Sequence, residues 1–182
     1  NPGLRVFLSL TDRVVDLIEE HVDVAIRMGP LADSRLLARR LCTFRRVLCC
    51  SPQYLRNAGA PREPADLARH ACLVFTHQAQ DGQWHLEDGR ASTTVPVRSA
   101  LRSDSQDALI EAARSGAGIV LAAPWAITRE LSEGALVRVL PAWHQAPLDV
   151  HAVFAESRAR CRPGRERSWT TSSPCGPRRS TS

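Results

Sequence analysis

Residues 12–41, DRVVDLIEEHVDVAIRMGPLADSRLLARRL, contain the pattern that decides the fold. Asp12 suits the N-cap of a helix, because its carboxylate can accept hydrogen bonds from the free N–H groups of a first turn. Val14, Leu17 and Ile18 follow at the spacing of one apolar helical stripe. The segment therefore predicts a short amphipathic helix that begins at Asp12.

Short extended runs lie on both sides of this predicted helix. Residues 4–10 form an apolar run before it and are expected to be a buried strand. Residues 23–26 are β-prone and stop at Gly29 and Pro30, and residues 36–41 begin another extended run. Strand, short helix and strand follow one another in a βαβ unit, so the sequence predicts an α/β fold with parallel strands.

The same alternation continues along the chain. Gly116 and Gly118 lie between a predicted helix and a predicted strand, where we expect a helix end and a close approach of two backbones. Leu101 is expected on the approach to that helix. Further strands are expected at residues 45–50, 72–75, 84–87, 93–97, 119–121, 136–140 and 148–154, and further helices at 53–57, 64–69, 105–115 and 124–131.

The net charge of +5 is concentrated at the end of the chain. Residues 157–182 contain seven Arg and one acidic residue, so the preceding residues carry a net charge of −1. A basic surface that binds nucleic acid is therefore not expected in the folded part. No apolar run reaches the roughly 20 residues of a membrane span, and no signal peptide precedes residue 4, so we expect a cytoplasmic protein without a membrane partner.

Motifs of enzymes and metal sites are missing from the sequence. There is no G-x-S-x-G elbow, no P-loop and no H-E-x-x-H motif, so we expect no enzyme, no catalytic residue and no cofactor. The six cysteines form no C-x-x-C pair, and no histidine is spaced to complete a zinc site. We expect no metal, and we expect the cysteines to be reduced and packed as small apolar groups.

Several short motifs, in their order and spacing, resemble the effector-binding domain of LysR-type transcriptional regulators. The resemblance covers residues 3 to about 157. Besides the opening segment, it rests on RVLCCSPQY at residues 46–54, DLARH at 66–70, SGAGIVL at 115–121 and GALVRVLP at 134–141. It implies a periplasmic-binding-protein-like α/β fold of type 2, in which two α/β lobes are joined by two crossover strands.

The resemblance also implies a division of the chain. Lobe I would consist of residues 1–45 and 150–157 and would be incomplete, because the first strand and helix of the family would precede Asn1. Lobe II would consist of residues 46–149. Residues 158–182 have no apolar periodicity, and we expect them to be disordered. With favourable third codon bases, a shifted reading frame of this stretch would encode an amphipathic helix, so our hypothesis is a frameshift near residues 158–160. The alternative is a genuine disordered basic tail.

A small-molecule site is expected where strands end and helix N-termini point N–H groups outward. The resemblance places this site between the two lobes. We expect the first two walls to come from Thr11 with Asp12 and from Ser103 with Asp104, although these residues can also serve only as helix caps. The remaining candidates for effector contact are Arg27, Met28, Gly29 and Trp84, of which Arg27 can also pair on the surface and Trp84 can also belong to the core.

The function implied is that of an effector-sensing domain which relays ligand binding to a winged helix-turn-helix outside this chain. The partners implied are an unknown small molecule, a second copy in a homodimer or tetramer, and DNA through the missing N-terminal domain. Because Asp12 and Asp104 are acidic, the effectors that could bind include neutral and cationic molecules. The alternative is a periplasmic solute-binding protein of a transporter, which has the same two-lobe fold but requires export.

Overall fold

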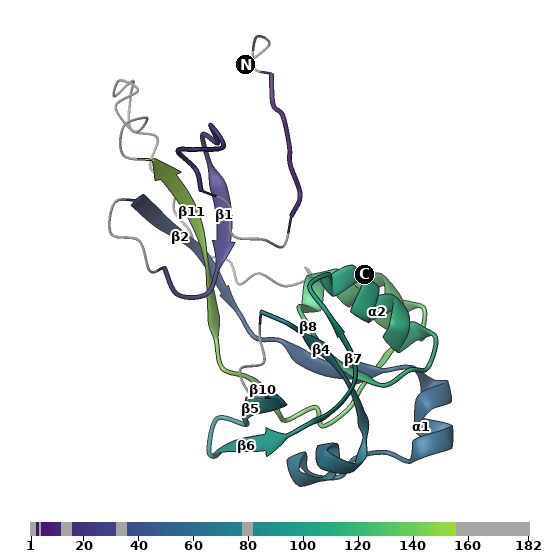
Figure 1. The fold of residues 1–182 in the computed structure, drawn as a ribbon. Coiled ribbons are helices and arrows are strands. Elements are labelled where there is room, and N and C mark those ends of the chain that lie inside the picture. Colours follow the sequence, from purple (N-terminus) through teal and green to yellow (C-terminus); the bar gives the residue numbers. More distant parts are fainter. Residues whose placement is uncertain (1–2, 4, 12–15, 32–35, 78–81, 156–182) are drawn as a thin grey trace, which may run out of the picture.

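The computed structural model describes residues 3, 5–11, 16–31, 36–77 and 82–155. The described strands form two separate sheets (Figure 1). The smaller sheet has the order β1-β11-β2, and both outer strands run antiparallel to β11. We call it the small sheet. Its strands are β1 (Ala25–Met28), β2 (Leu36–Phe44) and β11 (Leu148–Ala155).

The second sheet, called the large sheet, has the order β6-β5-β10-β3-β8-β4-β7, with β9 paired to β3. Its parallel pairs are β4 with β7 and β4 with β8, and its other pairs are antiparallel. The strands are β3 (Val47–Cys50), β4 (Ala71–Phe75), β5 (Gln83–Glu87), β6 (Ser92–Pro96), β7 (Arg98–Ser103), β8 (Ile119–Ala122), β9 (Val137–Arg138) and β10 (His144–Gln145).

Helices cover both faces of the large sheet. On one face, α1 and η1 contribute Tyr54 and Leu67 to a cluster with the core strands. On the other face, α2 contributes Leu109 and Ala113 to a second cluster. The helices are α1 (Pro52–Ala58), η1 (Pro64–Arg69), α2 (Gln106–Arg114), η3 (Pro124–Ile127) and α3 (Thr128–Ser132).

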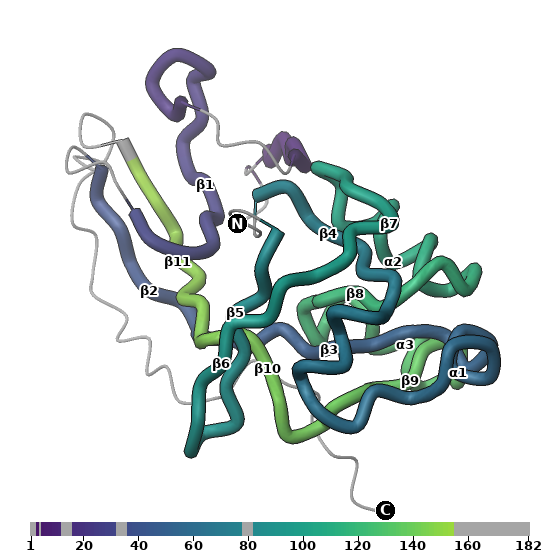
Figure 2. Tube along the Cα trace, turned by 60° about the horizontal axis from the view of Figure 1, so that its bottom comes forward, coloured from purple at the N-terminus to yellow at the C-terminus, as the bar shows by residue number. Residues whose placement is uncertain are grey.

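Two short crossovers connect the sheets. Residues 45–46 lead from β2 into β3, and residues 146–147 lead from β10 into β11. Strands β2 and β11 lie side by side in both views (Figure 1, Figure 2). Phe44, Ala123 and Val150 form a third buried cluster where the crossovers meet the large sheet. The two-sheet arrangement agrees with the expected fold class, whereas the lobe limits at 45, 46, 149 and 150 stay a prediction.

Most predicted elements of the large sheet are confirmed within a few residues. Pro52 and Pro64 lie at the start of α1 and η1, where a missing N–H group costs no hydrogen bond. Gly116 has a φ of +89° directly after α2. A Cβ at Gly118 would lie 2.4 Å from the carbonyl oxygen of Ala71, so the expected close backbone approach is also confirmed.

The prediction of a buried strand at residues 4–10 is wrong for the residues that the structure describes. Residues 5–10 are assigned to no strand. The side chains of Val6, Phe7 and Leu8 are 78%, 94% and 73% exposed. An apolar run becomes a strand only when a neighbouring strand accepts its hydrogen bonds.

The helix predicted from Asp12 is only partly described, because residues 12–15 lie outside the described residues. Residues 17–21 form turns in which the N–H of Glu20 donates to the carbonyl of Asp16 (3.0 Å). Leu17 is 2% exposed, but Ile18 is 55% exposed. The predicted apolar stripe is therefore wrong at Ile18, which faces water.

The parallel pairing expected for the opening segment is also wrong among the described strands. Both β1 and β2 pair with β11, which comes more than 100 residues later in the sequence. Leu101 lies inside strand β7 and not on the approach to a helix.

The strand expected at residues 136–140 is reduced to Val137–Arg138, since Leu140 adopts a turn conformation with a φ of +47°. Residues 158–182 lie outside the described residues.

Candidate functional site

Strands β4, β7 and β8 run parallel and end at the same edge of the large sheet. Phe75 pairs with Ser103, and the N–H of Thr76 donates to the Ser103 carbonyl (2.9 Å). Helix α2 begins just after this edge. The N–H groups of its first turn therefore lie next to the ends of the parallel strands, which is a common place for ligands in α/β folds.

Two candidate residues, Ser103 and Asp104, lie at this edge. Ser103 is half-buried, and its hydroxyl accepts a hydrogen bond from the N–H of Ser105 (3.0 Å). Asp104 is exposed. The N-cap of α2 is Ser105, whose hydroxyl accepts from the N–H of Ala108 (3.4 Å). Ser105 therefore caps the helix and leaves the carboxylate of Asp104 exposed to solvent.

The candidates Arg27, Met28 and Gly29 lie at the end of β1 in the small sheet. Met28 is 51% exposed, and Arg27 is paired in register with His151. Gly29 is buried and has a φ of +92°, a conformation that side chains other than glycine rarely adopt. Its N–H donates to the carbonyl of Asp149 (2.9 Å), so the end of β1 is held at the start of β11.

The other candidates are placed differently. Thr11 is exposed and belongs to no strand or helix. Asp12 lies outside the described residues. Trp84 is 2% exposed and is part of the core of the large sheet. The alternation of β5 that was expected from the sequence directs Trp84 inward, so its burial counts against a contact with an effector.

Trp125 was missed as a candidate. It follows β8 at the sheet edge that also carries Ser103, and it is 41% exposed. Its ring centroid lies 4.3 Å from that of Phe44, with an interplanar angle of 63°. The rule that strand ends carry ligand groups could have found Trp125, because the strand at residues 119–121 was expected from the sequence.

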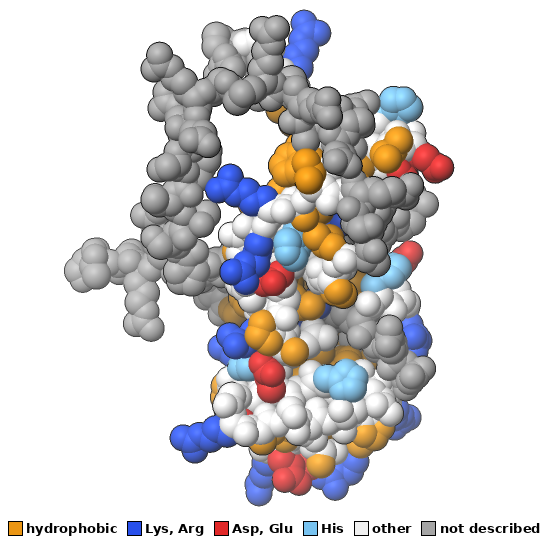
Figure 3. Space-filling view, turned by 90° about the vertical axis from the view of Figure 1, so that its left-hand side faces the viewer, with side chains coloured by type: hydrophobic (Ala, Val, Ile, Leu, Met, Phe, Trp, Pro, Cys, Tyr) orange, Lys and Arg blue, Asp and Glu red, His pale blue; other side chains and the backbone are white. Residues whose placement is uncertain are grey.

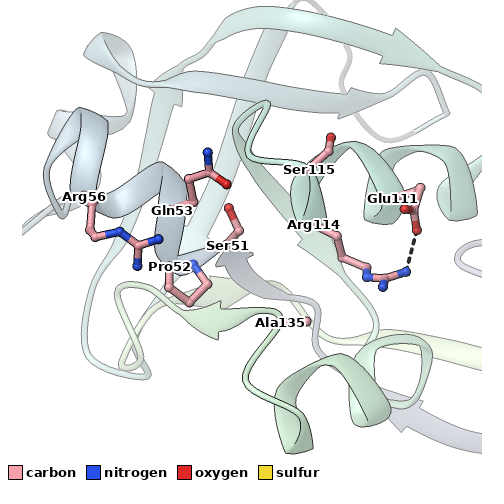
Figure 4. A pocket seen from close by; sticks show the side chains of 8 residues that line it. All are labelled: Ser51, Pro52, Gln53, Arg56, Glu111, Arg114, Ser115 and Ala135. Carbon is pink, nitrogen blue, oxygen red and sulfur yellow. Dashed lines mark hydrogen bonds and ion pairs between the residues drawn. The ribbon is translucent and has the colours of Figure 1, made fainter.

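The two pockets described in the structure lie elsewhere. A pocket of about 280 Å³ lies against β5 and β6. An open pocket of about 460 Å³ lies between the start of α1 and the end of α2 (Figure 4). In it Arg114 pairs with Glu111 (2.7 Å), so the wall carries both signs of charge. The larger pocket is lined by Ser51, Pro52, Gln53, Arg56, Glu111, Arg114, Ser115 and Ala135, none of which was a candidate.

Three buried cysteines of the large sheet are not activated as nucleophiles. Burial raises the pKa of Cys49, Cys50 and Cys72 to about 12, so these groups stay protonated at neutral pH and pack as apolar groups. Among the described residues, no group of three or more His, Cys, Asp or Glu side chains is arranged to hold a metal ion.

No helix within the described ranges has the length and apolar character that a membrane crossing requires.

The curated proteins similar to this chain include several HTH-type transcriptional regulators. An HTH-type transcriptional repressor of Pseudomonas aeruginosa is 35% identical over 159 residues, which are 86% of this chain and 50% of the relative. The HTH-type transcriptional regulator DmlR of Escherichia coli is 34% identical over 159 residues, which are 87% of this chain and 52% of the relative. The chain thus spans about half the length of the curated relatives it matches.

Solved structures show the same fold. Full-length AphB of Vibrio cholerae, described as a member of the LTTR family, has a TM-score of 0.74 at 25% identity, over 87% of this chain and 54% of that chain. The regulatory domain of CrgA from Neisseria meningitidis, described as a LysR-type transcriptional regulator, has a TM-score of 0.69 at 30% identity, over 79% of this chain and 70% of that chain.

The sequence model of one family, described as "LysR substrate binding domain", matches residues 1–163. This range contains every described element, from β1 to β11. The chain therefore belongs to the LysR substrate binding domain family and has its periplasmic-binding-protein-like α/β fold.

Proposed function

We propose that this chain is the effector-sensing part of a LysR-type transcriptional regulator. A small molecule would bind between the small and large sheets, and binding would favour one arrangement of the two sheets over another. The observation that carries this proposal is the family match over residues 1–163, together with relatives that are transcriptional regulators. These relatives favour the regulator over the alternative of a transporter's solute-binding protein.

The placement of polar groups supports the proposed site. Ser103 and Asp104 lie where the parallel strands of the large sheet end, beside the first turn of α2. Arg27 and Met28 lie at the end of β1, close to the crossover that enters β11. A ligand that spans the two sheets would therefore meet a hydroxyl and a carboxylate on one side and a guanidinium on the other. We also propose Thr11 as a contact.

The whole protein would act on DNA through a helix-turn-helix outside this chain, as the HTH-type names of the relatives suggest. We propose that it is cytoplasmic and that it assembles as a homodimer or tetramer. An effector would then act by a coupling free energy between the ligand site and the DNA-binding domains. The relatives are regulators and not enzymes, and the proposal includes no catalytic step.

A thermal-shift screen tests the proposed site. The purified chain is heated with single mono- and dicarboxylates, amino acids, sugars and amines, because the candidate residues include both signs of charge. A ligand at about 100 times its Kd would add about 2.7 kcal/mol to the free energy of unfolding. We expect the responding compound to lose its effect in Ser103→Ala and Arg27→Ala.

Arg56→Ala is the matched control, because Arg56 lines the pocket between α1 and α2. We expect the responding compound to keep its full effect in this variant. The opposite result would be a thermal shift that disappears in Arg56→Ala but remains in Ser103→Ala and Arg27→Ala. It would show that the ligand binds in the pocket between α1 and α2, and it would contradict the proposed site.

A further inference from the structure

The first crossover is bonded to the end of β10, directly before the second crossover. The backbone N–H of Gln145 donates to the carbonyl of Arg46 (3.1 Å). Strand pairs flank this bond on both sides, so the crossing is a nearly continuous two-stranded ribbon. The flanking pairs are Phe44 with Leu148 toward the small sheet and Val47 with His144 toward the large sheet.

The side chain of Arg46 makes a second bond between the first crossover and the end of β10. Its Nη1 donates to Oε1 of Gln145 (3.0 Å), and its guanidinium carbon lies 5.5 Å from the centroid of the Phe44 ring. Burial lowers the pKa of Arg46 to about 10, so the group is still charged at neutral pH. A partly desolvated charge is stable only with its hydrogen bonds made, which favours a fixed position for this guanidinium.

A helical segment of the large sheet packs on the same place. Segment η3 follows β8 and carries Trp125, whose ring meets the Phe44 ring edge-on at 4.3 Å. Ala123, from just before η3, is buried with Phe44 and Val150 of the small-sheet strands. The sheets are therefore held by packing across the crossing as well as by the two connecting segments.

We propose that Phe44, Arg46, Gln145 and Trp125 form a crossover clamp that sets the angle between the two sheets in the absence of ligand. The consequence for sensing rests on the proposed function. If the effector binds between the sheets, the clamp sets the fraction of molecules in the binding-competent arrangement. The apparent affinity for the effector then scales with that fraction.

Distance distributions between two spin labels test the clamp directly. Labels are attached through a ketone-bearing non-natural amino acid, since the chain contains six cysteines. One label replaces Arg39 in β2 and the other replaces Asn57 in α1, both of which are exposed. We expect Arg46→Ala and Trp125→Ala to broaden the distribution about twofold or more, because a released hinge samples several angles.

Arg45→Ala is the matched control. Arg45 is the neighbouring arginine on the same crossover, but its side chain is 52% exposed, and its Nε lies 3.6 Å from Oε1 of Glu87 at the end of β5. We expect this variant to keep the distribution of the unmodified chain. Broadening in Arg45→Ala as large as that in Arg46→Ala would overturn the proposal, because the effect would then follow charge on the crossover and not the clamp.

An unchanged distribution in a folded Arg46→Ala would also overturn the clamp. If Arg46→Ala does not fold, Gln145→Ala is measured instead, since it removes only the side-chain acceptor of the Arg46 hydrogen bond. A broader distance distribution in Gln145→Ala supports the clamp, and an unchanged width contradicts it. These measurements contain no ligand. Failure of the thermal-shift screen would therefore leave the clamp result standing, and failure of the clamp would leave a ligand response intact.

Discussion

The large and small sheets differ in how completely their apolar surfaces are covered. Two clusters of buried side chains lie on the faces of the large sheet. In the small sheet, Ile26, Met28 and Leu37 are 58%, 51% and 47% exposed. Figure 3, which views the molecule from the small-sheet side, shows hydrophobic side chains at the surface among arginines. Since apolar surface stabilises a fold only when it leaves water, stability should be concentrated in the large sheet.

Truncating one leucine in each sheet gives the sharpest contrast. Leu121 of β8 is 1% exposed, and Leu37 of β2 is 47% exposed. We expect Leu121→Ala to lower the free energy of unfolding by about 2–5 kcal/mol, because it removes buried methyl groups and leaves a cavity. Leu37→Ala should cost about 0.5 kcal/mol or less. Urea denaturation of both variants checks this, and equal costs would break the comparison.

Gly118→Ala tests the tightness of the large sheet. The new Cβ would lie 2.4 Å from the carbonyl oxygen of Ala71, a backbone atom that cannot rotate away. We expect a loss of about 1–3 kcal/mol from overpacking. Gly134→Ala is the control, because its Cβ would meet nothing within 4 Å and only its φ of +71° is strained. It should cost about 1 kcal/mol, so a larger loss than in Gly118→Ala would contradict the expectation.

Acid should weaken the large sheet through His70. The Tyr54 hydroxyl accepts a hydrogen bond from the N–H of Ala71 (2.9 Å) and lies 3.0 Å from Nδ1 of His70. When Nδ1 carries no proton, it accepts a hydrogen bond from the Tyr54 hydroxyl. Burial lowers the pKa of His70 below its usual 6.5, although Asp66 opposes this effect. The folded state thus favours neutral His70. The contribution of neutral His70 to the free energy of unfolding is complete above pH 6.5. This contribution is lost as the pH falls through 6.5 toward the pKa of His70 in the folded state.

Urea denaturation between pH 7.5 and pH 5 measures this loss. We expect the unmodified chain to lose stability over this range more steeply than His70→Gln, which cannot titrate at this position. Tyr54→Phe should cost about 1–3 kcal/mol at pH 7.5, since it removes the acceptor of the part-buried N–H of Ala71. Parallel pH profiles for the unmodified chain and His70→Gln would rule out His70 as the titrating group.

The smallest effect is expected in the small sheet. Arg40 and Asp149 form an ion pair at 3.7 Å, and their side chains are 65% and 38% exposed. Water and salt screen such a pair, so Arg40→Gln should change the free energy of unfolding by about 1 kcal/mol or less. The change should shrink further in 1 M NaCl. A loss above 2 kcal/mol in denaturation experiments would show that charge, and not packing, holds the small sheet.

The elements of the large sheet were the most predictable part of the fold. The alternation of Trp84 and Leu86 in β5 and the spacing of Leu109 and Ala113 in α2 are local patterns, and the structure confirms both. The opening segment was less predictable. Residues 5–10 have the composition of a strand, but no strand in the described part of the chain pairs with them.

The positions of the candidate residues were predicted only in part, for a related reason. Gly29 was expected after a strand and Ser103 before a helix, and both lie there, whereas their contact with an effector stays a prediction. A period-2 pattern shows that Trp84 and Leu86 share a face, but it does not show that this face is buried. The contact between Trp125 and Phe44 joins residues about 80 positions apart, and no local pattern predicts it.

The sequence by itself determined the family and the approximate positions of most strands and helices of the large sheet, although it predicted neither β7 nor β10. These features depend on side-chain periodicity, proline and glycine, which act within a few residues. Only the tertiary structure decided that β11 inserts between β1 and β2, and that Phe44, Arg46, Gln145 and Trp125 meet at the crossing. The physical reason is that strand pairing and packing depend on the free energy of contacts between segments far apart in the sequence. A local sequence pattern does not specify which distant segment a strand will contact.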